Sequence, residues 1–216
     1  MGAPYRLERA AWRRGLTRVA GVDEAGRGPL AGPVVAAAVV LSPGVKIKGV
    51  DDSKRLEAER REELYEVIRA RAVAWAVGIV DPSTIDRINI LEATRVAMRA
   101  ALEGLSVLPE LVLTDFVEVR GLECPQTNLV RGDQRSASVA AASIVAKVTR
   151  DRLMKDADQV FPQYGFARHK GYATEEHRAA LDRHGPCSLH RQSFRSVWEL
   201  AQGELFPEDR ARDGMD

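Results

Sequence analysis

The feature that most constrains the fold is a nearly continuous run of valine and alanine over residues 34–41. A run this apolar predicts a strand that is buried on both faces, because a half-exposed strand would alternate apolar and polar side chains. A second apolar segment, residues 17–22, comes before it, and a turn-rich stretch with two Gly-Pro steps separates the two. So short a connection predicts that the two strands are antiparallel neighbours.

The rest of the chain alternates between strand and helix patterns. The further predicted strands cover residues 73–80, 111–114 and 127–130, and the predicted helices cover residues 56–70, 90–105 and 136–155. This order predicts an α/β fold in which helices flank a mixed sheet. The predicted divisions are an N-terminal extension at 1–17, a main domain at 18–175, a small C-terminal helical appendage at 176–205 and a disordered tail at 206–216.

Length and composition limit the class of protein. With 216 residues, 45% of them hydrophobic, the chain is long enough for one globular domain with a substantial core. No apolar run could span a bilayer and no secretory signal begins the chain, so a cytoplasmic protein without a membrane partner is expected. The net charge is only +1. Any binding of a polyanion must therefore use local positive charge or bound metal.

The two cysteines carry little functional signal. Cys124 and Cys187 are isolated from each other in the sequence and are expected to be free thiols. Cys187 lies between His184 and His190, which suggests a zinc site at first sight. No second ligand pair follows at finger-like spacing, so we do not predict zinc there.

Carboxylates follow two of the predicted strands. Asp23 comes directly after the strand at 17–22, and Asp115 comes directly after the strand at 111–114. If these strands are neighbours, the two acids repel each other unless a cation lies between them. Oxygen ligands without nearby histidine or cysteine favour Mg²⁺ or Mn²⁺ over Zn²⁺. Glu24 can reach the same site only if its strand ends there, because successive strand residues point to opposite faces.

Several segments, in order along the chain, resemble the type 2 ribonuclease H family. They are Val-Asp-Glu-Ala-Gly-Arg-Gly-Pro at 22–29, Asp-Ser-Lys-Arg-Leu at 52–56, Ser-Ile-Val-Ala-Lys-Val-Thr-Arg-Asp at 143–151, Tyr-Gly-Phe at 164–166, His-Lys-Gly-Tyr at 169–172 and His-Arg-Gln-Ser-Phe at 190–194. The first segment is highly specific, and the resemblance extends over about residues 18–201. It implies that residues 18–175 form a ribonuclease H-like catalytic domain.

The resemblance also implies a set of site residues. Four carboxylates would be catalytic and would bind two Mg²⁺ or Mn²⁺ ions, namely Asp23, Glu24, Asp115 and Asp133. The substrate-binding residues would be Gly26, Arg27 and Gly28, which form a turn that reads the ribose 2′-hydroxyl, together with Tyr172 at the sugar and Lys54 and Lys147 at phosphates. We expect His169 to orient the loop that carries Tyr172.

The activity that the resemblance implies is metal-dependent cleavage of RNA within nucleic-acid duplexes. The family hydrolyses the RNA strand of RNA–DNA hybrids and cuts on the 5′ side of single ribonucleotides in duplex DNA, which leaves 3′-hydroxyl and 5′-phosphate ends. Two alternatives stay open. One is another ribonuclease H-like metal nuclease, of the resolvase type, and the other is a catalytically silent protein that binds hybrids.

Two positions within the resemblance leave a choice. The family usually has glycine after the acid at the end of the fourth strand, whereas Phe116 follows Asp115 here. Asp151 rivals Asp133 for the fourth carboxylate role, but it lies deep in a predicted helix after a basic residue. We therefore expect Asp151 to form a structural ion pair. The chain is expected to be a monomer. Two interpretations of the tail around Phe206 stay open, a short partner motif and, as the plainer one, a disordered end, and the sequence does not decide whether a clamp protein recruits the chain.

Overall fold

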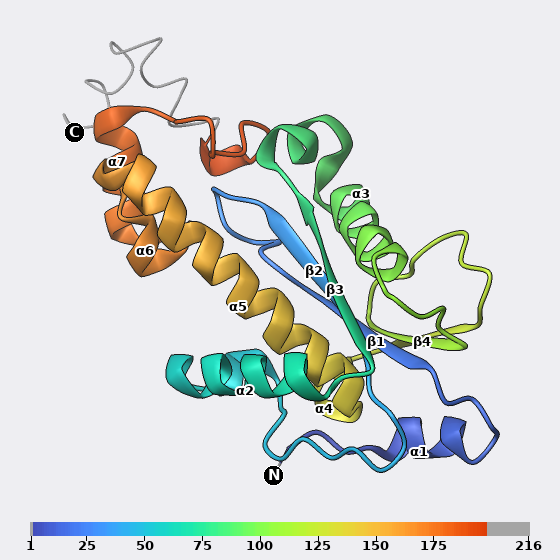
Figure 1. Cartoon of the computed structure of the whole chain (residues 1–216). Coiled ribbons are helices and arrows are strands. Elements are labelled where there is room, and N and C mark those ends of the chain that lie inside the picture. The colour runs from blue at the N-terminus through green and yellow to red at the C-terminus, as the bar shows by residue number, and fades with distance from the viewer. Residues whose placement is uncertain (1, 198–216) are drawn as a thin grey trace, which may run out of the picture.

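The computed structural model describes residues 2–197, which form a five-stranded mixed sheet with helices on both faces (Figure 1). The strands are β1 (Val19–Ala25), β2 (Val34–Val40), β3 (Ala74–Val80), β4 (Leu111–Asp115) and β5 (Gln126–Leu129), in the spatial order β3-β2-β1-β4-β5. β1, β2 and β3 pair antiparallel, whereas β1, β4 and β5 pair parallel. The predicted antiparallel pair and the mixed sheet are confirmed.

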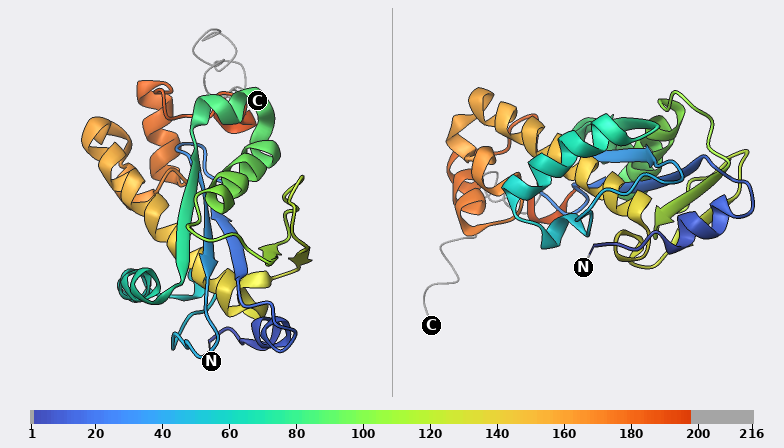
Figure 2. Two further views of the ribbon diagram at one scale, coloured as in Figure 1. Left: turned by 45° about the vertical axis from the view of Figure 1, so that its right-hand side comes forward. Right: turned by 60° about the horizontal axis from the view of Figure 1, so that its bottom comes forward.

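Seven α-helices and two short 3-10 helices are present among the described residues. They are α1 (Arg6–Trp12), η1 (Ser53–Arg55), α2 (Ala58–Arg71), α3 (Pro82–Glu103), α4 (Gly132–Arg135), α5 (Ala137–Val160), η2 (Pro162–Tyr164), α6 (Phe166–His169) and α7 (Glu175–His184). The long helices α3 and α5 lie on opposite sides of the sheet, and α2 packs beside α5 (Figures 1 and 2). No helix within the described part of the chain is long and apolar enough to cross a membrane.

The valine and alanine run on β2 separates two hydrophobic cores. Ala37 and Val39 pack into the core that α5 and α2 cover, and Ala36 and Ala38 pack into the core that α3 covers. Because β2 lies between β1 and β3, it has a helix layer on each face. Every residue of β2 is therefore fully buried, as the continuous apolar pattern predicts.

Small residues let the two long helices approach the sheet closely. A Cβ atom on Gly21 of β1 would lie 2.1 Å from the carbonyl carbon of Ser138 on α5, and one on Gly78 of β3 would lie 2.0 Å from the carbonyl oxygen of Ala97 on α3. Both contacts are too short for any side chain. The sheet positions therefore require glycine, and α5 begins directly against β1.

The bounds of β1, α3 and α5 differ most from the predicted ones, and α5 continues past residue 155 to Val160. β1 does not end before Asp23 but continues through it to Ala25, paired with β2 along its whole length. α3 begins at Pro82 instead of residue 90, because two helical segments meet at Asn89, whose φ is +65°. The Asn89 side chain accepts hydrogen bonds from the amides of Leu91 and Glu92. The predicted helix was the second of these two segments.

The two ends of the described part of the chain pack on the main body. α1 was not predicted within the N-terminal extension, and it lies beside the start of α5 and α4 (Figure 1). Leu181 of α7 packs with Leu30 and Val197. The predicted tail, including Phe206, lies outside the described residues.

Candidate active site

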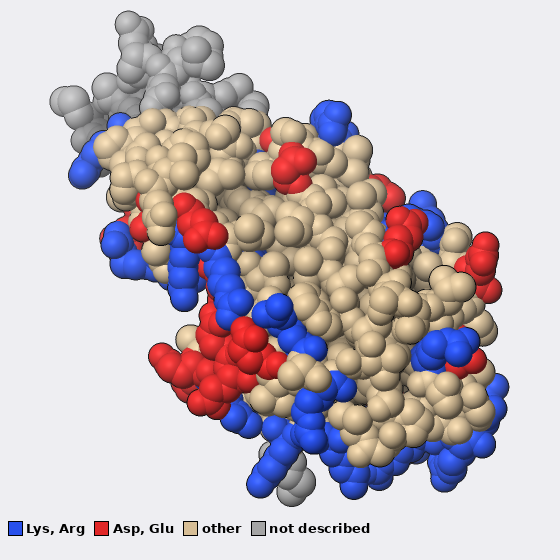
Figure 3. Space-filling view, viewed as in Figure 1, with Lys and Arg blue, Asp and Glu red and all other residues tan. Residues whose placement is uncertain are grey.

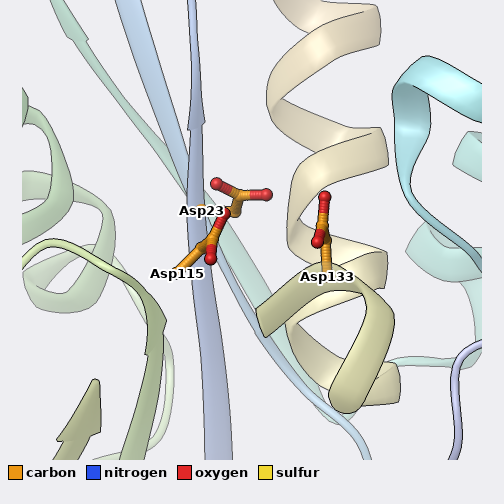
Figure 4. Close-up of side chains that lie close together, drawn as sticks. All are labelled: Asp23, Asp115 and Asp133. Carbon is orange, nitrogen blue, oxygen red and sulfur yellow. The ribbon is translucent and has the colours of Figure 1, made fainter. Parts of the chain in front are cut away.

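Three aspartates from different elements bring their carboxylates together. Asp23 lies on β1, Asp115 ends β4, and Asp133 lies on the short helix α4 (Figure 4). One oxygen of each lies within 4.8 Å of the others, and no other group of acids, histidines or cysteines in residues 2–197 has this arrangement. Because β1 and β4 are parallel neighbours with Val22 opposite Thr114, the next residue on each strand is an aspartate at the same level.

The site is held by local hydrogen bonds. The amide of Gly132 donates to Oδ1 of Asp115 over 2.7 Å, which ties the end of β4 to the start of α4. The amide of Glu24 donates to Oδ1 of Asp23 over 2.7 Å. Asp23 and Asp133 are each only 6% exposed. These contacts keep buried negative charges close to one another.

Burial and repulsion by neighbouring acids raise the pKa values of Asp23 and Asp133. Burial raises the pKa of Asp23 well above its ordinary value, and Glu24 and Asp115 raise it further. Burial, followed by Asp52 and Asp115, raises the pKa of Asp133 to about 6. The carboxylates would be stable as a fully charged set only beside compensating positive charge. A divalent cation held by oxygen atoms meets that need.

Glu24 lies close to the three aspartates without being one of their group. Burial raises the pKa of Glu24, the neighbouring Arg27 opposes that shift, and Asp115 adds to it. Its Oε1 accepts a hydrogen bond from Nη1 of Arg27 over 3.3 Å, while its Oε2 is buried without a partner among the described residues. An unpartnered buried carboxylate oxygen is costly, which is consistent with a cation as its missing partner.

Asp52 was missed as a neighbour of the acids. The sequence placed it only in the Asp-Ser-Lys-Arg-Leu segment, yet it lies beside Asp133 and raises that residue's pKa. Its Oδ1 caps η1 by accepting from the amide of Lys54, and its Oδ2 accepts from Gln134 over 3.4 Å. Lys54 is close enough to lower the pKa values of Glu24 and Asp133. The structure therefore places this predicted phosphate contact beside the acids.

The glycine turn after β1 is fixed by a buried arginine from the C-terminal segment. Arg191 is fully buried, and its guanidinium donates to the carbonyls of Gly26, Arg27 and Gly32 over 2.5 to 3.0 Å. A Cβ on Gly28 would meet no heavy atom within 4 Å, so the turn is open on that side. Burial, followed by Arg150, lowers the pKa of Arg191 to about 9.

A second buried arginine holds the neighbouring turn. Arg150 on α5 donates to the carbonyls of Ala31, Pro33 and Lys170 over 2.9 to 3.0 Å. The segment of the chain before β2 is thereby joined to the loop that leads to Tyr172. Arg150 and Arg191 both lie in family-like segments, but nothing in their spacing indicated that they bind backbone carbonyls instead of phosphates.

Tyr172, in the loop that Arg150 holds, lies beside Lys147 of α5. Tyr172 is 43% exposed, and Nζ of Lys147 lies 5.8 Å from its ring centre. Lys147 also pairs with Asp151 at 2.7 Å, and Arg61 approaches the same carboxylate at 4.0 Å. Asp151 thus forms the structural ion pair that was predicted for it.

Histidines support the loop that carries Tyr172. Nδ1 of His169 accepts from the amide of Gly171 over 3.1 Å, which agrees with the orienting role expected of it. The ring of His177 contacts the Tyr172 carbonyl at 2.8 Å and His190 at 3.1 Å. His190 in turn contacts the amide and Sγ of Cys187. These contacts give the histidines structural partners, and Cys124 and Cys187 are free, as predicted.

Phe116 occupies a backbone conformation that favours glycine. Its φ is +59° and its side chain is 69% exposed, so the ring contributes little burial to offset the strain. We expect Phe116→Gly to raise the free energy of unfolding by about 0.5–1 kcal/mol, as measured by urea denaturation. Phe116→Ala is the matched control because it removes the ring and keeps a Cβ. Equal stability of the two variants would show that the backbone is not strained there.

The raised pKa of Asp133 predicts a pH-dependent stability. The unfolded chain binds fewer protons at this group between its ordinary pKa of 3.8 and the folded value of about 6, so stability falls as pH rises through that window and stays low above it. In chelator at pH 7.5, Asp133→Asn should therefore be more stable than wild type. Its free energy of unfolding should be higher by about 1–2 kcal/mol after allowance for solvent screening, which thermal denaturation would show as a higher melting temperature.

Divalent metal should reverse this difference, because it stabilises the wild-type carboxylates more than the variant's amide. The exposed Asp156→Asn on α5 is the control and should change the melting temperature little. A wild-type protein that melts above Asp133→Asn in chelator at pH 7.5 would contradict the assigned repulsion.

Comparison with known proteins identifies the family. The family model for ribonuclease HII matches residues 20–199. The chain is 57% identical to ribonuclease HII of Moorella thermoacetica over 193 residues, covering 89% of this chain and 94% of that one. It is 56% identical to ribonuclease HII of Sinorhizobium medicae, covering 91% of each.

Solved structures agree with this assignment. The ribonuclease H2 of Pyrococcus horikoshii superposes with a TM-score of 0.74 at 27% identity, covering 88% of this chain and 99% of that one. The PCNA:RNase HII complex of Archaeoglobus fulgidus gives a TM-score of 0.67 at 30% identity, covering 84% and 96%. A ribonuclease HIII in complex with Mn²⁺ shares the fold, with a TM-score of 0.71 at 19% identity. From its sequence and its fold alike, the chain belongs to the ribonuclease HII family and is a ribonuclease H endonuclease.

Proposed function

We propose that this chain hydrolyses the RNA strand of RNA–DNA hybrids and also cuts on the 5′ side of single ribonucleotides in duplex DNA. The products would carry 3′-hydroxyl and 5′-phosphate ends. The main observation behind the proposal is that the carboxylates of Asp23, Asp115 and Asp133 lie close together, near a glycine turn with free space beside Gly28. Membership of the ribonuclease HII family supports the same reaction.

The acids are proposed to hold Mg²⁺ or Mn²⁺, with two ions during catalysis. Asp23, Asp115 and Asp133 would be ligands, and the unpartnered Oε2 of Glu24 would complete the set. When bound, such ions neutralise charge on the scissile phosphate and activate water for attack. An all-oxygen donor set suits these hard cations. The raised pKa values of Asp23 and Asp133 support a site that is completed by cations.

Ribose recognition is proposed for the turn formed by Gly26, Arg27 and Gly28. Arg191 sets the direction of the Gly26 and Arg27 carbonyls, so the backbone of the turn is ordered before substrate binds. Gly28 leaves space beside that backbone for a sugar. A backbone group at a fixed position can distinguish a 2′-hydroxyl from hydrogen, which is the difference between RNA and DNA.

The duplex is proposed to lie near a groove between α2, α5 and α6. Tyr172 lines this groove. Its basic residues outnumber its acids, so it carries local positive charge that the net charge of the chain does not reveal; the bases are Arg61, Lys147, Lys155, Arg168 and Lys170, and the acids are Glu59, Glu62 and Asp151. Lys54 adds charge beside the acids. Lys147 would contact phosphate while it is paired with Asp151. Because the Asp151 carboxylate offsets part of its charge, Lys147 would attract phosphate less strongly than an unpaired lysine.

The remaining biological assignments are also proposals. We propose that the chain acts as a monomer in the cytoplasm. The ribonuclease HII of Archaeoglobus fulgidus was solved as a complex with PCNA, and recruitment of this chain by a protein of that kind is proposed by analogy alone.

A duplex DNA with one embedded ribonucleotide tests the reaction directly. With Mg²⁺ or Mn²⁺, we expect one cut on the 5′ side of the ribonucleotide, none in the all-DNA duplex, and none in either duplex when chelator is added. Asp133→Asn should lower the rate by at least about 100-fold, since it removes a metal ligand. Asp156→Asn should cut at the wild-type rate. Gel analysis of both labelled strands gives the position and the ends.

The outcomes separate this proposal from its alternatives. Cleavage of the all-DNA duplex or of a four-way junction without preference for ribose would indicate a nuclease of the resolvase type. Binding of hybrids without any cleavage would indicate a silent hybrid-binding protein. Cutting by Asp133→Asn at the wild-type rate would move the fourth ligand role to another acid, and activity in chelator would refute the metal mechanism.

The sugar contact of Tyr172 is tested by side-chain replacement. Tyr172→Ala should lower kcat/KM at an isolated ribonucleotide by about 10-fold, on the scale of one lost aromatic contact. Tyr172→Phe keeps the ring and should retain most of the activity if packing on the sugar matters more than the hydroxyl. Because Tyr172 is partly exposed, neither change should lower the melting temperature much. Unchanged kinetics in Tyr172→Ala would remove this residue from the site.

A further inference from the structure

The N-terminal helix α1 carries arginines that lack carboxylate partners. Arg6 and Arg9 on α1 and Arg13, the residue that caps its C-terminal end, are exposed, and no acid within the described residues lies within 4.0 Å of any of them. Several arginines on α2, α3 and α5 differ in this respect, because Arg60, Arg99 and Arg152 pair with glutamates. The positive charge on α1 is therefore not neutralised within the folded chain.

The one acid of α1 points inward and fastens the helix. Glu8 is fully buried, and its Oε1 accepts hydrogen bonds from the hydroxyl of Ser136 and from the amide and hydroxyl of Ser138, over 2.5 to 2.9 Å. These residues form the start of α5, where a carboxylate is also favoured by the helix dipole. α1 is thus held in a fixed position with only arginines among its charged groups on the outside.

The arginines surround a hollow with an aromatic wall. Pro4, Tyr5, Arg6, Arg9, Trp12 and Arg13 line it. The rings of Tyr5 and Trp12 have centroids 6.3 Å apart. A surface that combines guanidinium groups with flat apolar side chains suits the phosphates and sugars of a nucleic-acid backbone.

This surface is continuous with the surroundings of the acid cluster. A second hollow is lined by Arg6, Leu7, Gln134 and Arg135, and Gln134 follows Asp133 directly on α4. Blue side chains gather along the lower edge of the molecule over α1, with little red among them (Figures 1 and 3). Positive charge therefore extends from the edge of the acid cluster to the far end of α1.

We propose that the outer face of α1, with Arg6, Arg9 and Arg13, binds phosphates in the flank of the duplex whose scissile bond lies at the aspartates. This inference rests on the proposed function, which supplies the substrate as a duplex that is cut at the aspartates. α1 lies before residues 20–199, which the family model matches, so this contact would be an addition to the catalytic domain. It supplies binding energy away from the reacting atoms.

The test compares two triple variants that remove the same charge. Arg6→Gln/Arg9→Gln/Arg13→Gln removes the α1 arginines, and Arg60→Gln/Arg99→Gln/Arg120→Gln removes three arginines that pair with glutamates. Binding of an all-DNA duplex in Mg²⁺ is followed by fluorescence anisotropy over a range of salt. Each lost phosphate contact reduces the steepness of the plot of log K against log salt concentration by about 0.9. The slope for the α1 variant should therefore be shallower than that of wild type by about 2 to 3.

Duplex length gives a second readout that a structural defect would not change. The cleaved duplex is shortened in steps of about one helical turn, roughly 10 base pairs, from either side of the ribonucleotide. We expect the α1 variant to raise KM with kcat retained on long duplexes. The difference in KM between the α1 variant and wild type should vanish once the duplex has been shortened on the side that α1 contacts. The control variant should follow wild type at every length.

The results keep this inference apart from the proposed function. Equal salt slopes and equal KM values for the two triple variants would overturn the α1 surface while leaving the cleavage reaction intact. A wild-type protein that binds duplex through α1 but does not cut at ribonucleotides would uphold the surface and refute the reaction. An α1 variant that loses affinity equally on the shortest and longest duplexes would also overturn the proposal, because the contact would then not lie on the flank.

Discussion

Buried negative charge at the junction of β1, β4 and α4 is the constraint on which the arrangement of the site depends. Asp23 and Asp133 are almost fully buried; Asp115 raises the pKa of both, and Asp133 also raises the pKa of Asp23. Folding can place such groups together only if the rest of the structure offsets their repulsion. The paired strands and the bond from Gly132 to Asp115 hold them in place, so the site costs stability that the proposed cations would restore.

Two buried arginines hold the backbone of the turns near the site by hydrogen bonds to its carbonyl groups. Arg150 and Arg191 carry no buried carboxylate partner, and their guanidinium groups satisfy six different carbonyls in three separate turns. Their multiple donors in a planar fork suit this role better than the single ammonium of a lysine. The turn after β1 and the loop before Tyr172 are therefore parts of one hydrogen-bonded unit. The shape of the proposed ribose site depends on α5 and on the C-terminal segment together.

The proposed catalytic and binding residues are separated in space. The acids lie on rigid strand and helix ends, where close packing at Gly21 and at the start of α5 allows little movement. The positively charged groups lie on helices further out, in the groove by Tyr172 and on α1. In the proposed function, this separation leaves the charge that would attract a polyanion exposed to water while the charge that would perform chemistry is buried. The net charge of +1 conceals both, because acids and bases cancel in the total.

The sequence by itself determined the sheet and the residue types of the site. The apolar run of β2 requires helices on both faces, and acids placed within or just after β1 and β4 indicate a metal site. Tertiary structure alone decided which distant groups complete it. Asp133 meets Asp23 across 110 residues, and Arg191 reaches the turn at Gly26 across 165 residues, while Glu8 turns inward to α5. Periodicity reports only neighbours within a few positions of the chain. Contacts between segments this far apart arise from packing, which no local pattern contains.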